Sequence, residues 1–171
     1  MGTLAIGWRA QQPFTTTGAE MALNRDKIGV SYPSIDHEIT REEIHLYAKA
    51  LGETDPRYLS ESDDCVAPPT YAARFTVVDP MINAIGDEEL GAHFALVHGS
   101  QSYEFGRPMR PGDVVTVTPT IADITYRGAN EFLSLTLDAS YADGTTCLAS
   151  ATTIVFLGSA PQKTEQPAKE A

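Results

Sequence analysis

Residues 131–157 read EFLSLTLDASYADGTTCLASATTIVFL, and this stretch decides the fold class. From Leu133 to Leu137, leucine alternates with serine or threonine, a period of two that is typical of a half-buried β-strand. Asp143 and Gly144 follow, and this pair is among the strongest short hairpin signals. The stretch therefore predicts two antiparallel strands joined by a tight turn.

The period of two extends upstream to the region after Gly91. There it predicts strands over residues 102–105, 113–125, 131–141 and 146–157. A further strand is expected near residues 30–39, and two helical segments separate it from the others. The order is therefore one strand, two helices and an antiparallel meander. This order predicts an α+β fold in which the helices cover one face of the sheet.

The first helical segment has clear boundaries. Thr40 and Glu43 form a capping box at its start, and Gly52 is a typical helix C-terminal residue. The apolar residues between them recur three or four apart, on one helical face: Ile44, Tyr47, Ala48 and Leu51.

The second helical segment begins at Pro68-Pro69-Thr70, because proline is favoured in the first turn of a helix. Pro80 is expected to kink or split it, and Gly86 to end it. Its apolar stripe is expected either in the core or along a substrate channel, and the sequence does not distinguish these two places. The stripe consists of Tyr71, Phe75, Val78, Ile82 and Ile85.

The chain has 171 residues and a formal net charge of −11, from 12 Lys and Arg against 23 Asp and Glu. This length suits one domain. Nucleic-acid binding needs a basic face, and anionic membranes would repel this chain, so neither partner is expected. We expect residues 1–20 to form a flexible extension, 21–159 a single domain and 160–171 a disordered tail.

The two cysteines, Cys65 and Cys147, are too few and too far apart for a disulfide framework or a zinc site. They are expected to be buried or half-buried thiols in a reducing compartment. The first residues lack the basic and then apolar pattern of a signal peptide. We therefore expect a cytoplasmic protein that holds no metal and no cofactor.

Three motifs stand out: GETDPRY at residues 52–58, APPT at 67–70, and LVHGSQSYEFGRPMRPGD at 96–113. Together they resemble the MaoC-like hot dog hydratases and dehydratases. Within this group, they are most similar to the N-terminal-type domain of the fatty-acid-synthase-I-like dehydratases. The likeness runs from about Met21 to Gly158. It is strongest to the HadA-type non-catalytic subunit of the (3R)-hydroxyacyl-ACP dehydratases.

The resemblance implies a hot dog fold, a curved antiparallel sheet wrapped around a long central helix, that works as a pair of such folds. It also implies a chemistry. Active relatives carry the signature Gly-Asp-x-Asn-Pro-aliphatic-His after the first helix, and its Asp and His handle the water and the proton. Hydration of a 2-enoyl thioester needs a base for water and a proton donor for C2.

This chain departs from that signature at four positions. Only Gly52 and Pro56 match it. The residues at the Asp, Asn, aliphatic and His positions are, in that order, Glu53, Asp55, Arg57 and Tyr58. A phenol with a pKa near ~10 is a poor base at neutral pH, whereas an imidazole near ~6.5 is well suited. The resemblance therefore implies a subunit whose own hydratase residues are degenerate.

The resulting hypothesis is a non-catalytic, substrate-accommodating subunit of a heteromeric (R)-specific enoyl thioester hydratase or (3R)-hydroxyacyl thioester dehydratase. Its substrate would be an acyl-CoA or acyl-ACP, and a catalytic MaoC-like partner would supply Asp and His. Two alternatives stay open: a self-sufficient homodimeric hydratase or thioesterase that uses His98 with Asp55 or Glu53, and a protein that binds acyl thioesters without turnover. The expected substrate-binding residues are Pro69, Thr70, Tyr71, Phe75, His98 and Gly99.

Plainer roles are also expected for several of these residues. Thr70 fits a first-turn or capping position, and His98 fits a structural or pocket-shaping one. The run from Arg107 to Asp113 fits a turn that redirects the chain. The remaining histidines are expected at the surface, and the loop acids in solvent: His37, His45 and His93; Glu53, Asp55, Asp63 and Asp64.

The net charge raises a further question, because coenzyme A and acyl carrier protein are both anionic and a chain of −11 would repel them. Either Arg74, Arg107 and Arg110 form a local basic cluster, or the docking surface belongs to the partner. We favour the partner.

Overall fold

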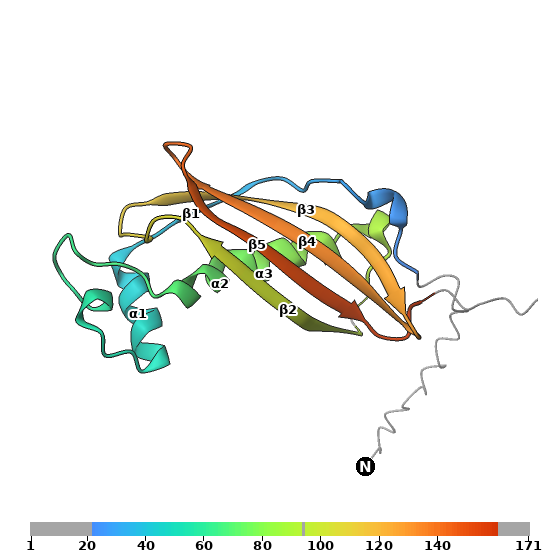
Figure 1. Ribbon diagram of the computed structural model, residues 1–171, viewed down its shortest axis with the longest axis horizontal. Helices are drawn as coiled ribbons and strands as arrows, with labels where there is room; N and C mark the ends of the chain where they lie inside the picture. Colours follow the sequence, from blue (N-terminus) through green and yellow to red (C-terminus); the bar gives the residue numbers. More distant parts are fainter. Residues whose placement is uncertain (1–21, 94, 161–171) are drawn as a thin grey trace, which may run out of the picture.

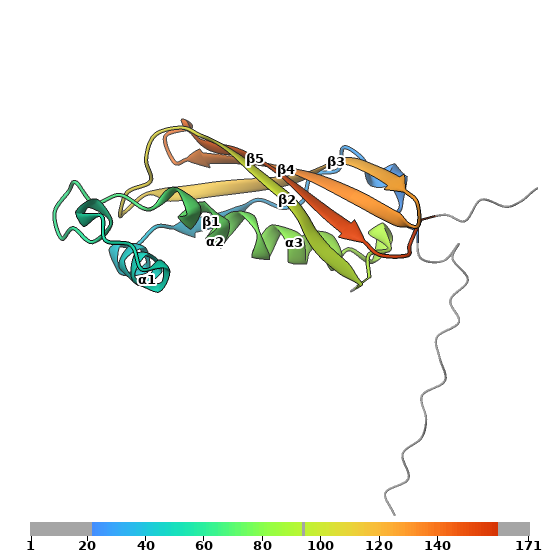
Figure 2. The same ribbon diagram turned by 60° about the horizontal axis from the view of Figure 1, so that its bottom comes forward.

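The computed structural model describes residues 22–93 and 95–160. Five antiparallel strands form one sheet in the order β1-β3-β4-β5-β2. The central helical segment lies across one face of this sheet, as Figures 1 and 2 show. The expected α+β architecture, with helices covering one face, is confirmed. A curved sheet around a central helix is the hot dog fold.

The strands that the alternating pattern predicts are present. Their bounds are β1 Ile35–Glu38, β2 Leu96–Phe105, β3 Val114–Arg127, β4 Asn130–Tyr141 and β5 Thr146–Phe156. The first strand is shorter than expected, although Ser31 bridges to Thr120 ahead of it. At the predicted hairpin the Tyr141 amide donates to the Thr145 carbonyl oxygen at 2.9 Å, with Gly144 at φ +81°. Only glycine adopts that backbone without strain.

The alternation in β4 separates the two faces of the sheet. Leu133, Leu135 and Leu137 are fully buried against the helices, while Ser134 and Thr136 lie on the opposite face. Every second residue of a strand faces the same side, so this pattern fixes the register of the hairpin with β5.

The first helix, α1 (Arg41–Leu51), has the predicted ends. The Thr40 hydroxyl accepts from the Glu43 amide at 3.2 Å, and Gly52 takes the left-handed conformation at φ +72°. In the other half of the capping box, the Glu43 carboxylate accepts from the Thr40 hydroxyl at 3.4 Å, and it also accepts from Tyr71 and Arg74 on the second helical segment. Leu51 also differs, since it is exposed while Ile44 is buried.

Proline splits the second helical segment, as predicted. It consists of η3 (Pro69–Ala72), α2 (Ala73–Thr76) and α3 (Val78–Ile85), with a break at Val77. The ring of Pro80 removes a backbone donor and crowds the carbonyl four residues earlier, at Thr76. The apolar stripe divides at this break. Tyr71 and Phe75 are buried in the core, whereas Val78 and Ile82 are 50% and 57% exposed.

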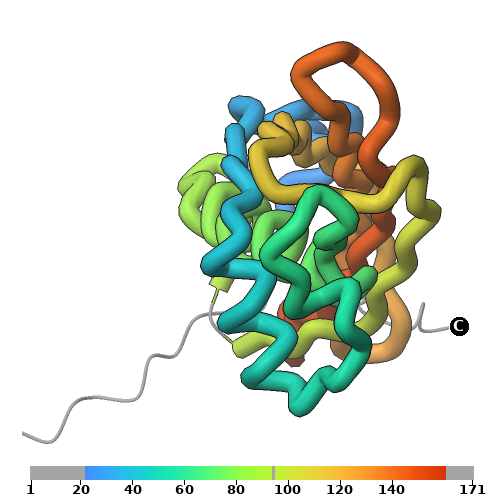
Figure 3. The backbone as a smooth tube through the Cα atoms, turned by 90° about the vertical axis from the view of Figure 1, so that its left-hand side faces the viewer, coloured from blue at the N-terminus to red at the C-terminus, as the bar shows by residue number. Residues whose placement is uncertain are grey.

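Short 3-10 turns complete the structure: η1 Arg25–Lys27, η2 Pro56–Tyr58 and η4 Glu88–Leu90. Helix α1 and the loop after it sit together at one end of the molecule, which faces the viewer in Figure 3. No helix in the described part of the chain has the length and apolar character that crossing a bilayer requires. Both cysteines are buried and free.

The domain continues to at least Ala160, one residue past the predicted boundary. Ala160 is buried, and its amide donates to the Ala129 carbonyl oxygen at 3.1 Å. The predicted N-terminal extension falls outside the described residues, as does the predicted tail beyond Ala160.

Candidate functional site

The loop after α1 is where the resemblance places the acid and the imidazole. Asp55 caps the 3-10 turn η2 and accepts from the Arg57 amide at 2.9 Å. The Arg57 guanidinium also donates to both carboxylate oxygens of Asp55, at 2.7 to 3.2 Å. These hydrogen bonds lower the pKa of Asp55. The carboxylate is thus ionised and already engaged by its own neighbour.

The other two substituted positions, Glu53 and Tyr58, differ in exposure. Glu53 is exposed, and its amide donates to the Ala48 carbonyl oxygen. Tyr58 is half-buried, with the Arg57 guanidinium 6.0 Å from its ring centre. Asp55 and Arg57 hold the η2 turn through the hydrogen bonds between them.

The start of the central helical segment carries the APPT motif. Pro69 and Thr70 are both exposed there. The Thr70 carbonyl oxygen accepts from the Tyr47 hydroxyl at 2.7 Å, and the Tyr71 amide donates to the Pro68 carbonyl oxygen at 2.9 Å. Thr70 is a first-turn residue, as expected, but the turn has no side-chain cap.

A polar cluster that sequence reasoning missed joins four elements beside this turn. The Tyr71 hydroxyl donates to Glu43 Oε2 at 3.1 Å, and Arg74 donates to Glu43 Oε1 at 3.1 Å. His37 Nε2 lies 3.1 Å from the Tyr71 hydroxyl oxygen. Since that hydroxyl gives its proton to Glu43, His37 must be the donor. These four residues lie 3 to 37 positions apart in the chain, so no local motif announces them.

Three groups in the cluster have displaced pKa values: His37, Glu43 and Tyr71. Burial lowers the pKa of His37, which favours the neutral imidazole. Burial alone would raise the pKa of Glu43, but hydrogen bonds from Tyr71 and Arg74 outweigh it and leave the pKa below its usual value. Burial also raises the pKa of Tyr71. A shallow cleft of about 260 Å³ runs beside the cluster, lined by Glu43, Leu46, Tyr47, Ala50 and Arg74.

The three histidines expected at the surface are only partly exposed. The His37 side chain is 19% exposed and the His45 side chain 14%. His45 Nε2 lies 3.2 Å from the Ser60 carbonyl oxygen. The ring of His93 meets the ring of Phe156 edge to face, with 5.3 Å between their centres, and its Nε2 atom is buried without a partner among the described residues.

His98 is the third residue of β2, and this strand begins at the end of the sheet remote from α1 (Figure 1). Its Nε2 atom lies 3.1 Å from the Ser100 carbonyl oxygen. From His98 to Phe105, which ends the strand, is roughly 23 Å at ~3.3 Å per residue. The structure therefore does not bring His98 and the loop acids Glu53 and Asp55 together within one chain.

Gly99 marks a β-bulge in this strand, because the pairing with β5 shifts between His98 and Ser100. A Cβ atom on Gly99 would lie 2.9 Å from Val155 Cγ2 and 3.2 Å from the Thr153 carbonyl oxygen. Glycine is required here by the close approach of β5. The role of Gly99 is to shape the strand.

Polar side chains interrupt the inner face of the sheet beyond the bulge. Gln101 Oε1 accepts from the Thr152 hydroxyl at 2.6 Å, and its amide nitrogen donates to Ser150. The Tyr103 hydroxyl lies 2.9 Å from the Thr76 hydroxyl on α2. The Thr76 proton goes to the Ala72 carbonyl oxygen, so Tyr103 donates to Thr76.

The RP-x-R-PGD motif forms a closed turn, as expected. Arg107 donates two hydrogen bonds of 2.8 Å to Asp113 and lies 3.5 Å from the ring centre of Tyr141. Burial opposes ionisation of Asp113, but the hydrogen bonds from Arg107 outweigh it and lower the pKa. Arg110 donates to the Asp63 carbonyl oxygen at 2.7 Å. Arg74 is paired with Glu43. Since Arg74, Arg107 and Arg110 each bind a different partner, they do not form a shared basic surface.

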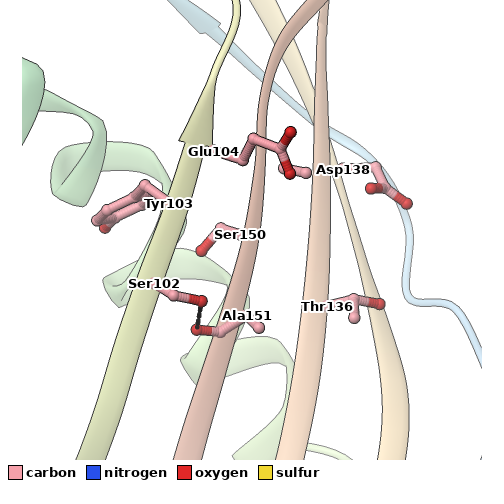
Figure 4. A pocket seen from close by; sticks show the side chains of 8 residues that line it. Ser102, Tyr103, Glu104, Thr136, Asp138, Ser150 and Ala151 are labelled. Atoms are coloured by element: carbon pink, nitrogen blue, oxygen red, sulfur yellow. Dashed lines mark hydrogen bonds between the residues drawn. The ribbon is translucent and has the colours of Figure 1, made fainter.

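A hollow of about 410 Å³ lies outside the predicted site. Figure 4 shows that the Glu104 and Asp138 carboxylates lie on one side of the strands that form it, and that Tyr103 points towards the helices. Ser102 donates to the Ala151 carbonyl oxygen at 3.5 Å along its floor. Within residues 22–93 and 95–160, no three His, Cys, Asp or Glu side chains gather as metal ligands.

The strand order and the helix across one face define a hot dog domain. Residues 26–146 match the profile of the FAS1-like dehydratase domain region. The chain belongs to this family. It is also 35% identical to a UPF0336 protein of Thermobifida fusca over 153 residues, which are 84% of this chain and all of that protein. A UPF0336 protein of Streptomyces coelicolor is 35% identical over 67% of this chain and 82% of its own length.

Solved structures support the same fold at low identity. The HadBC (3R)-hydroxyacyl-ACP dehydratase complex of Mycobacterium tuberculosis matches with a TM-score of 0.63 and 20% identity, over 76% of this chain and 97% of that chain. The ChsH1-ChsH2 complex of the same organism matches with a TM-score of 0.62 and 15% identity, over 82% and 91%. The hot dog fold predicted from the motifs is confirmed.

Proposed function

We propose that this chain is the non-catalytic, substrate-accommodating subunit of a heteromeric (R)-specific enoyl thioester hydratase or (3R)-hydroxyacyl thioester dehydratase. The observation that carries the proposal is the loop at residues 52–58. Its Asp55 carboxylate is held by Arg57, and its last position is a phenol. The base and the acid for hydration then come from a catalytic hot dog partner.

The chemistry supports this assignment. Hydration needs one group that accepts a proton from water and one that donates a proton to C2, both near neutral pKa. Tyr58 stands where active relatives carry the catalytic imidazole. Glu53 is exposed at the loop surface. Neither residue has an imidazole beside it in the described loop.

The proposed substrate contacts divide into two groups. Pro69 and Thr70 at the helix start, and His98 on the edge strand, are exposed and available for contact with a thioester. Tyr71 and Phe75 are fully buried, so we now assign them to the wall behind the substrate. The exposed apolar residues of α3, Val78 and Ile82, fit an acyl channel that the partner completes.

The charges favour docking of the carrier on the partner. Arg74 and Arg107 are paired with Glu43 and Asp113, and Arg110 is bound to a backbone carbonyl. An anionic carrier would approach a chain of net −11 whose arginines are already engaged. Two structural neighbours are complexes by their own description, which supports a heteromer here. We also place the protein in the cytoplasm, on its two free cysteines.

Reconstitution tests this proposal. The purified chain is mixed with a MaoC-like subunit that carries an intact Asp and His, and hydration of a crotonyl thioester is followed. We expect negligible turnover by the chain alone and at least a tenfold gain over the partner alone. Turnover by the chain alone at the rate of the mixture would contradict the proposal. Tight binding without turnover in either case would instead support a binding protein.

A further inference from the structure

A polar network lies on the inner face of the sheet, among residues that are otherwise apolar. Thr152 and Ser150 on β5 are each 5% exposed, and Gln101 on β2 joins them through its side-chain amide. Thr152 opposes Leu135 on β4 and Ser150 opposes Leu137, and both leucines are buried. Opposed residues share a face, so the two hydroxyls also lie on the side of the helices. Buried polar groups of this kind need hydrogen-bond partners.

This network carries more donor hydrogens than its own hydrogen bonds use. The Gln101 amide nitrogen has two hydrogens, and the hydroxyls of Ser150 and Thr152 have one each. Two hydrogen bonds join the three side chains, and each bond uses one hydrogen. Two donor hydrogens are therefore left, without another acceptor in hydrogen-bond range among the described residues. The result is the same if the amide oxygen and nitrogen exchange places, because each bond still uses one hydrogen.

The neighbouring pair of hydroxyls on the same face has no hydrogen to spare. The Tyr103 hydroxyl donates to Thr76 Oγ1 at 2.9 Å, and the Thr76 hydroxyl donates to the Ala72 carbonyl oxygen at 2.8 Å. Both hydrogens are used, so this pair ties β2 to α2 and offers nothing to a ligand as a donor. Of these two polar groups, only the network at Gln101 has donors left over.

The network lies well away from the APPT turn at the start of the central helical segment. Thr76 is seven residues past Pro69, which is roughly 10 Å along a helix at ~1.5 Å per residue. Tyr103 contacts Thr76, and Gln101 is two residues from Tyr103, roughly 7 Å along β2 at ~3.3 Å per residue. Gln101 is half-buried on an edge strand, so its amide is accessible to an acyl chain that lies between β2 and the helices.

We infer that Gln101 and Ser150 bind a carbonyl oxygen carried on the acyl chain of the substrate, beyond the carbons that react. The inference rests on the proposed function and adds a substrate class to it, acyl thioesters with a carbonyl group on the chain. A carbonyl oxygen has two lone pairs and no hydrogen, so it accepts both remaining hydrogens. A plain alkyl chain would cover the donors without satisfying them, which is unfavourable in a buried channel.

Binding of matched acyl thioesters tests this inference without the need for turnover. A series of saturated acyl-CoA thioesters of one length carries a single carbonyl group at successive chain positions, and the plain chain is the reference. Calorimetric titration is performed on the chain alone and on the chain mixed with a MaoC-like subunit. We expect one carbonyl position to bind at least about tenfold more tightly than the plain chain, because a site with buried donors disfavours a ligand that lacks the acceptor.

Two variants remove the remaining donors in different ways. Gln101→Glu keeps the shape of the side chain, and both hydroxyls then donate to the carboxylate, so no donor hydrogen is left. The triple variant Gln101→Leu, Ser150→Ala and Thr152→Val removes the donors without adding a charge. Both should lose the preference for the carbonyl group. Tyr103→Phe is the matched control on the same face of β2, because its hydroxyl hydrogen is already used, and its preference should stay within about twofold of the unmodified chain.

Thermal unfolding shows whether each variant is folded before its affinities are compared. Equal affinity for the plain chain and for every carbonyl-bearing chain would overturn the inference. A preference that survives both Gln101→Glu and the triple variant would also overturn it, as would an equal loss in Tyr103→Phe. The proposed function fails on a different result, turnover by the chain alone, whereas the preference is measured from binding.

Discussion

His37 shows how a single residue couples the stability of this fold to protons. Its ring packs against Phe75 at 5.2 Å between centres, and burial lowers its pKa. The charged and titratable groups that face it come from four helical elements: Tyr71 on η3, Glu43 on α1, Arg74 on α2 and Asp79 on α3. The folded chain therefore holds a neutral imidazole where the unfolded chain would bind a proton near pH ~6.5.

This difference sets a sign for the dependence of stability on pH. Below about pH 6.5 the unfolded chain takes up a proton that folded His37 does not, so the free energy of unfolding falls as pH falls. His37→Gln keeps a donor for Tyr71 and should flatten this decline. Urea unfolding of both proteins at pH 7, 6 and 5 measures how far the free energy of unfolding declines. Equal losses for the two proteins over that range would show that His37 is not the group responsible.

The helix ends and the helix break could be predicted, because each depends on residues that are close in the sequence. Thr40 and Gly52 bound α1 because caps depend on neighbouring residues, and Pro80 splits the central helical segment through its own ring. The exposure of Val78 and Ile82 was not predictable, because an apolar stripe on a helix does not indicate how much of that helix the sheet covers. The cluster at Glu43 was also missed, because it depends on contacts across the fold.

That cluster supports a prediction about how the elements are held together. Glu43→Ala removes the acceptor of the buried Tyr71 hydroxyl and the partner of Arg74. Leaving a buried donor without a partner costs about 1–3 kcal/mol, so the free energy of unfolding should fall by about 2 kcal/mol. Glu42→Ala is the matched control, one residue away and exposed, with an expected change within about 0.5 kcal/mol. Urea titration compares them, and equal losses would refute the bridging role of Glu43.

For the whole molecule, the sequence predicted the sheet but not the geometry that separates the candidate residues. His98 lies near the start of β2, at the end of the sheet remote from α1, whereas the loop acids follow α1 (Figure 1). Only the long-range pairing of β2 with β5 sets this distance. A site built from both would need a second chain.

The central claim is that proton transfer belongs to the partner and not to this chain. In the reconstituted pair, the most direct measurement compares kcat for crotonyl thioester hydration after substitutions on each side. Glu53→Gln with Tyr58→Phe in this chain should change kcat by less than about twofold, whereas replacing the catalytic imidazole of the partner subunit should lower it by a factor of about 10² to 10⁴. A large loss of kcat from the substitutions in this chain, with the partner's imidazole dispensable, would contradict the account.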